Sequence, residues 1–142
     1  MEKMKRAVLG RKLISLTEET KENGISEAMT ILGLSSVGED MRVVDVKEVL
    51  ENRDFVSSLS NCESKVLVFD KFEMLTYEEK IKFSHIIKGL WEISLRKNGE
   101  KVIIVISDSN LTQYNFDLAL RTVHISKWLK YEKSWHINKC LL

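Results

Sequence analysis

Short apolar runs, rich in β-branched residues, recur along the chain and predict β-strands. They cover residues 12–16, 42–46, 65–69 and 101–106. Residues 102–106 are apolar at every position, which is typical of a central strand that is covered on both faces. Between these runs, apolar residues recur with helical spacing and predict helices. The predicted helices cover residues 25–34, 46–59 and 77–97.

The last of these helices has recognisable boundaries in the sequence. Thr76 precedes Glu78 and Glu79, which predicts a helix start because a hydroxyl can cap the first turn and acidic side chains are favourable there. Residues 97–99, a lysine, an asparagine and a glycine, predict the end of the helix. We therefore expect a long, well-bounded helix over residues 77–97.

Strands that alternate with helices indicate an α/β fold. We expect three layers, α/β/α, around a mostly parallel sheet of about five strands, because parallel strands are joined by helical crossovers. Residues 121–129 and 134–142 predict two further strands that pair as an antiparallel hairpin at the C-terminal edge of the sheet. The length of 142 residues and the absence of proline indicate one domain over residues 1–142.

The composition favours a soluble globular protein, with 44% hydrophobic and 30% charged residues. No apolar stretch approaches the roughly 20 residues that span a bilayer, and the N-terminal residues lack the apolar segment of a secretory signal. Cys62 and Cys140 do not form a metal-type pair and fit a reducing compartment. We expect a cytoplasmic protein without membrane contact, bound metal or cofactor.

Charge is distributed unevenly, although the net charge is only +1. Residues 1–12 and residues 121–142 each carry a net +4, so the middle of the chain carries −7. Aromatic and basic side chains alternate in the C-terminal segment, a mixture that suits either nucleic acid or a protein interface. The candidate contact residues there are Arg121, Lys127, Trp128, Lys130, Lys133 and Trp135.

A candidate ligand site follows from where the polar residues stand relative to the predicted strands. The apolar residues 66–69 end at Asp70, and residues 103–106 are followed by Ser107 and, three positions later, Asn110. In open α/β sheets, ligands bind beyond the carboxyl ends of the strands. We therefore expect the segments that follow Leu16, Asp70 and Ile106 to lie together.

The segment after the first strand fits only part of a phosphate-binding loop. Residues 19–26 can be aligned with G-x-x-x-x-G-K-[ST], in which glycines allow close backbone approach and the lysine reaches the β- and γ-phosphates. Gly24 and Ser26 match this frame, whereas Glu19 replaces the first glycine and Ile25 replaces the lysine. The alternative is an ordinary acidic turn that ends where Ser26 caps the next helix.

In this order of loop, Asp-ended strand and polar-ended strand, the chain resembles the P-loop ATPases of the RecA-like and AAA+ group over roughly residues 12–127. The resemblance implies that Asp70 occupies the magnesium position and that Ser107 or Asn110 occupies the position that senses the γ-phosphate. Arg121 resembles the arginine before the last core strand of AAA+ members. Lys71 departs from the second acid, which orients the attacking water, because a lysine cannot accept a proton at neutral pH.

The missing groups predict a catalytically inactive member of that group. The resemblance implies an accessory subunit that contacts a protein partner or its own copies, in an assembly for DNA replication, recombination or repair. One alternative is a nucleic-acid-binding module that uses the basic ends of the chain. The other is a receiver-like signalling domain, in which Glu18, Glu19, Asp70, Ser107 and Lys127 take the acidic, phosphate-accepting, hydroxyl and lysine positions.

Overall fold

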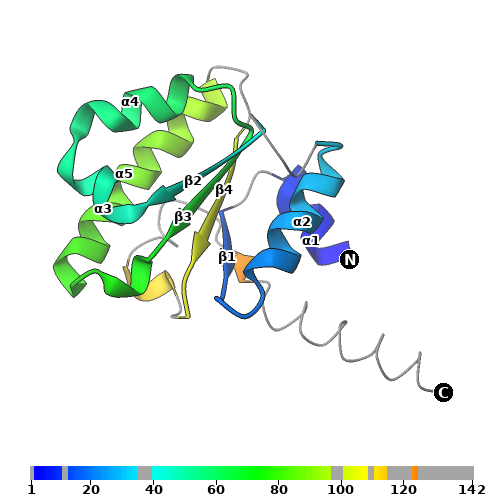
Figure 1. Cartoon of the computed structure of the whole chain (residues 1–142), viewed down its shortest axis with the longest axis horizontal. Helices are drawn as coiled ribbons and strands as arrows, with labels where there is room; N and C mark the ends of the chain where they lie inside the picture. Colours follow the sequence, from blue (N-terminus) through cyan, green and yellow to red (C-terminus); the bar gives the residue numbers. More distant parts are fainter. Residues whose placement is uncertain are drawn as a thin grey trace.

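The protein is an α/β structure in which helices cover both faces of a parallel sheet (Figure 1). The computed structural model describes residues 2–10, 13–34, 40–96, 101–108, 111–114 and 123–124. The α/β class and the parallel sheet expected from the sequence are confirmed.

The sheet has the strand order β2-β3-β4-β1, with a two-residue strand, β5, beyond β1. All the strand pairs are parallel. The strands are β1 (Ile14–Leu16), β2 (Met41–Asp45), β3 (Val66–Asp70), β4 (Val102–Ile106) and β5 (Val123–His124). β5 pairs with β1 in parallel, and the rest of the C-terminal hairpin expected from the sequence lies outside the described residues.

Helices α1 and α2 cover one face of the sheet, and α3, α4 and α5 cover the other (Figure 1). Their bounds are α1 (Glu2–Leu9), α2 (Lys21–Ile31), α3 (Val46–Glu51), α4 (Arg53–Asn61) and α5 (Tyr77–Arg96), with 3-10 turns η1 (Phe72–Met74) and η2 (Leu111–Tyr114). From β1 the chain passes through α2 to β2 at one edge of the sheet. It then returns toward β1, through α3 and α4 to β3 and through α5 to β4. Right-handed crossovers then require the outgoing and returning helices to lie on opposite faces.

Each face of the sheet has its own hydrophobic cluster, because side chains alternate along a strand. Leu67 and Phe69 of β3 face α3, α4 and α5, where they join the buried Phe72 and Phe83. Val66 and Val68 belong to the cluster under α1 and α2. Burial of β3 and β4 on both faces explains their continuous apolar sequence.

The predicted helix over residues 46–59 is wrong in one respect, because it is two helices that meet at Asn52. The backbone of Asn52 is extended, with φ −137°, and its side-chain oxygen accepts a hydrogen bond from the Asp54 amide at 3.1 Å. The start of α5 is as predicted. The Thr76 hydroxyl accepts from the Glu79 amide at 3.2 Å, while the Glu79 carboxylate accepts from the Thr76 amide at 2.9 Å, a reciprocal capping box.

Helix α1 was not expected from the sequence, which showed mainly positive charge in this segment. Met4, Ala7 and Val8 lie on one face of the helix and are buried against the cluster under α1 and α2. A helix of 8 residues is marginal by itself, so this packing is what stabilises it.

Candidate functional site

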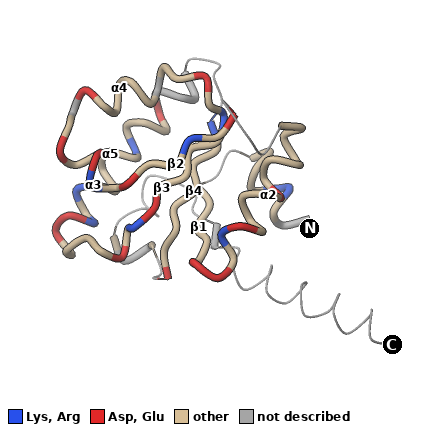
Figure 2. Tube along the Cα trace, in the orientation of Figure 1, with Lys and Arg blue, Asp and Glu red and all other residues tan. Residues whose placement is uncertain are grey.

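The structure brings together the strand ends that the sequence singled out. β1 and β3 both lie beside β4, and all three strands point the same way, so their carboxyl ends share one edge. The chain leaves β1 toward one face and β3 toward the other, which makes this edge the position where α/β sheets bind ligands. Residues 17–21, 45, 70–73 and 107–108 form this edge, called the rim below. Figure 2 shows charged residues of both signs along it.

The first segment of the rim is not the loop expected over residues 19–26. β1 ends at Leu16 and α2 already begins at Lys21, so only four residues connect them. The predicted loop residues Gly24, Ile25 and Ser26 lie within α2, and Ser26 does not cap it. The connection is shorter than the six positions from glycine to glycine in a phosphate-binding loop, and it contains no glycine.

Gly24 has a packing function instead. A Cβ atom at this position would overlap the side chain of Leu16, so the glycine lets α2 lie close against the end of β1. We expect Gly24→Ala to lower the free energy of unfolding by about 1–3 kcal/mol, because overpacking outweighs the better helix propensity of alanine. Urea denaturation would measure this loss.

The matched control for this prediction is Gly89→Ala in α5. Within the described part of the chain, no atom lies within 4 Å of a Cβ atom placed on Gly89, so alanine is expected to raise stability there by up to about 1 kcal/mol. Equal stabilisation by both substitutions would show that Leu16 moves aside freely and would contradict the packing function of Gly24.

Lys21, rather than a residue at position 25, brings a positive charge into the rim. Its Nζ lies 3.3 Å from Glu18 Oε2 and 3.4 Å from Asp70 Oδ2. The hydrogen bond with Glu18 has the largest effect and raises the pKa of Lys21. Burial opposes it, and the charge of Asp70 adds to the increase, so the net shift is upward. The sequence frame placed Ile25 at the motif lysine position, but in the structure Lys21 is the residue that reaches the rim. The lysine is present, and it is paired with the candidate magnesium ligand.

The end of β3 is held by a second ion pair. Lys71 adopts a left-handed conformation, with φ +67°, and its amide donates to Asp70 Oδ1 at 2.9 Å. Its Nζ lies 3.3 Å from Asp45 Oδ2. Asp45 also accepts from the Lys47 amide at the start of α3, which lowers the pKa of its carboxyl, and the charge of Lys71 lowers it further. The lysine that replaces a second acid thus ties β3 to β2.

The end of β4 is held by Glu73 of η1. Ser107 is buried, and its hydroxyl donates to Glu73 Oε1, which also accepts from the Asp108 amide at 3.0 Å. The other Glu73 oxygen accepts from Lys80 Nζ at 3.3 Å. Burial lowers the pKa of Lys80, but its hydrogen bonds to Glu73 and Tyr114 outweigh this, so the net shift is upward. The Ser107 hydroxyl therefore binds Glu73 in this structure.

Four carboxylates of the rim, those of Glu18, Asp45, Asp70 and Glu73, thus bind lysine or serine side chains of the same chain. Among the described residues, no group of three His, Cys, Asp or Glu side chains is placed to hold a metal ion. A cation at Asp70 would compete with the ammonium group of Lys21. Glu19 lies on the exposed turn before α2. Several predicted site residues lie outside the described residues, namely Asn110, Arg121, Lys127, Trp128, Lys130, Lys133 and Trp135.

Two residues of the rim were missed in the sequence as contributors to its geometry. Lys21 follows Thr20 and is the first residue of α2. A predicted helix that began at residue 21, and not at residue 25, would have placed Lys21 at the end of β1. Glu73 lies three positions after Asp70 on a short 3-10 turn, and no local pattern indicates that it reaches β4.

Comparison of the chain with known protein families, curated proteins and solved structures gave no match. Within the part of the chain that the structure describes, no helix is both long enough and apolar enough to cross a membrane.

Proposed function

We propose that this chain is a non-enzymatic P-loop ATPase-like domain that acts as an accessory subunit through protein contacts. The ion pair between Lys21 and Asp70 carries the proposal. In an active site of this group, the corresponding lysine would bind phosphate and the aspartate would bind magnesium. Here each charge neutralises the other.

The short connection after β1 supports the same conclusion. Phosphate binding at a helix N-terminus needs several backbone amides that point toward the ligand, and glycines permit that close approach. The segment Thr17, Glu18, Glu19 and Thr20 supplies two carboxylates and no glycine. A triphosphate would meet like charge at the position where it needs donors.

The strand order favours this proposal over a receiver-like domain. Receivers have the flavodoxin-like order 2-1-3-4-5, in which the first strand lies between the second and the third. In this protein β4 lies between β1 and β3, and β1 is far from β2. The resemblance further implies a place beside DNA replication, recombination or repair machinery, with a protein partner or copies of the chain as the contact.

Nucleotide assays on the purified chain test the proposal. With magnesium-ATP up to about 1 mM, we expect no hydrolysis and no saturable binding that depends on Asp70. Release of phosphate that disappears in Asp70→Ala would overturn the proposal, because it would show that Asp70 exchanges Lys21 for magnesium during turnover.

The matched control is Asp108→Ala, which removes an exposed carboxylate from the same rim. Any change that both variants share reflects the overall charge of the rim. Lys21→Ala is the third variant. An active site would lose phosphate affinity in this variant. The proposal predicts the same nucleotide binding and hydrolysis as in the wild type.

A further inference from the structure

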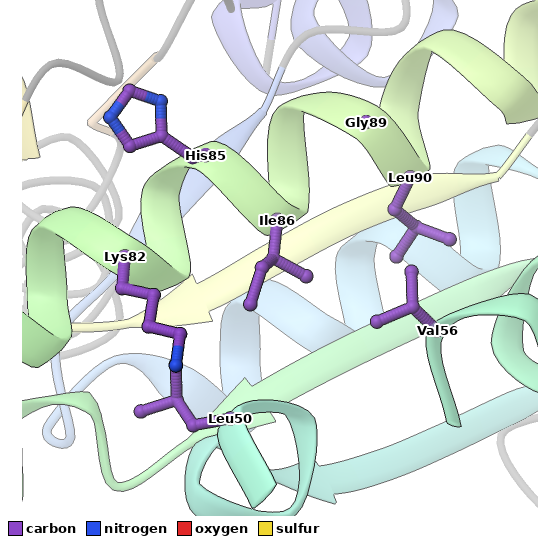
Figure 3. A pocket seen from close by; sticks show the side chains of 7 residues that line it. All are labelled: Leu50, Val56, Lys82, His85, Ile86, Gly89 and Leu90. Atoms are coloured by element: carbon purple, nitrogen blue, oxygen red, sulfur yellow. The ribbon is translucent and has the colours of Figure 1, made fainter. Parts of the chain in front are cut away.

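A hydrophobic groove lies between α3, α4 and α5, and none of its lining residues belongs to the rim. Its volume is about 360 Å³. Figure 3 shows Ile86 and Leu90 of α5 on the side of the helix that faces Leu50 of α3 and Val56 of α4. The residues that line the groove are Leu50, Val56, Lys82, His85, Ile86, Gly89 and Leu90.

Gly89 leaves the surface of α5 bare in the wall of this groove. It lies inside the 20-residue helix α5, where glycine is less favourable than alanine by roughly 1 kcal/mol. Among the described residues, no atom lies within 4 Å of a Cβ atom placed there, so none of them requires the missing side chain. This differs from Gly24, whose missing side chain is needed by Leu16. In the wall of an apolar groove, the missing side chain permits close approach of another backbone.

The groove is suited to a helix rather than a strand. Its walls are helices, so they offer no open row of backbone donors and acceptors for strand addition. From Lys82 to Leu90, α5 rises about 12 Å, the length over which a partner helix presents apolar side chains at positions i, i+4 and i+7. A bare helix surface at Gly89 allows the two axes to come within the usual 8–10 Å packing distance.

The charge of the lining indicates the chemistry of the partner. Lys82 is exposed and borders the apolar residues, and none of the described residues that line the groove is Asp or Glu. We propose that the groove binds an acidic amphipathic helix of a partner protein, with its apolar stripe against Ile86 and Leu90 and a carboxylate near Lys82. This inference adds a contact surface to the proposed accessory role, and it rests on the groove and not on the state of the rim.

A pair of synthetic helical peptides of about 18 residues tests the inference. Both carry leucine at positions i, i+4 and i+7, and they differ only in flanking glutamates or flanking lysines. Titration of the full chain, followed by anisotropy, is expected to show saturable binding of the glutamate peptide. The lysine peptide is expected to bind at least about tenfold more weakly.

Variants of the chain locate the binding. Gly89→Leu fills the groove and is expected to weaken the glutamate peptide at least about tenfold, while circular dichroism and the melting temperature stay at or above those of the wild type. Gly89→Ala is the smaller second variant and should weaken binding in the same direction. Lys82→Glu is expected to reverse the preference between the peptides. Lys88→Glu, an exposed charge of α5 outside the lining, should preserve it.

Three results would overturn the inference. The first is no saturable binding of the glutamate peptide up to about 1 mM. The second is an affinity for the glutamate peptide that neither Gly89→Leu nor Lys82→Glu changes. The third is self-association in sedimentation equilibrium that Gly89→Leu abolishes, which would assign the groove to a second copy of the chain. None of these results depends on ATP, so the nucleotide assays and the peptide assays can fail separately.

Discussion

Phe83→Ala is expected to lower the free energy of unfolding by about 3–5 kcal/mol. Phe83 is fully buried, and its ring lies 5.5 Å from that of Phe69 in β3 and 5.7 Å from that of Phe72 in η1. It therefore joins α5 to the sheet and to the turn that carries Glu73. Truncation removes a large apolar area and the edge-to-face ring contact, and the close-packed surroundings cannot refill the space. Urea unfolding followed by circular dichroism would measure the loss.

Tyr77→Ala is the matched control, because it truncates another aromatic side chain of α5 that is 64% exposed. Its ring lies 5.7 Å from that of Tyr114, and the expected loss is about 1 kcal/mol or less. Similar losses for the two variants would mean that α5 does not pack on the sheet as described, and both the groove and the Glu73 contact would lose their support.

Lys101→Ala is expected to lower the free energy of unfolding by about 2–4 kcal/mol. Lys101 immediately precedes β4 and is 7% exposed. Its Nζ donates to the backbone oxygens of Cys62 and Ser64, at 2.6 Å each, and lies 3.6 Å from Cys62 Sγ. The ammonium group thus closes the connection between α4 and β3. Its loss leaves two carbonyl groups without their donor in a largely buried place.

The control for this prediction is Lys65→Ala, which removes an exposed lysine that immediately precedes the neighbouring strand β3. We expect a change within about 0.5 kcal/mol, as for most surface substitutions. Thermal unfolding in parallel with urea would reveal whether the two variants differ. A small effect of Lys101→Ala would show that water replaces the ammonium at both carbonyls, contrary to the prediction.

The sequence predicted an element correctly where a local pattern of residues is sufficient to define that element. β3 was predicted because an apolar run of four residues closes with Asp70, and β4 because each of its positions is apolar. The start of α5 was predicted because Thr76 and Glu79 cap the helix through contacts three residues apart. Such patterns depend on neighbours in the chain, so they can be read without knowing the fold.

The same reasoning failed where a distant contact decides the local structure. The apolar pattern of α2 begins only at Ile25, yet the helix starts at Lys21 and its first turn packs Gly24 against the distant Leu16. α1 forms because Met4, Ala7 and Val8 pack into the hydrophobic cluster on one face of the sheet. Helix propensity is too weak to predict either outcome, since tertiary packing supplies most of the stability of short helices.

The sequence by itself therefore determined the alternation of strands and helices, the parallel α/β class and the arrival of Asp70 at the end of a buried strand. Only the tertiary structure decided that β4 lies between β1 and β3, and that Lys21 meets Asp70 across 49 positions and Ser107 meets Glu73 across 34. The physical reason is that periodicity reports which side of an element is buried, whereas strand order and ion pairing depend on which elements become neighbours in space. The charges of the rim could be listed from the sequence, but their mutual neutralisation could not.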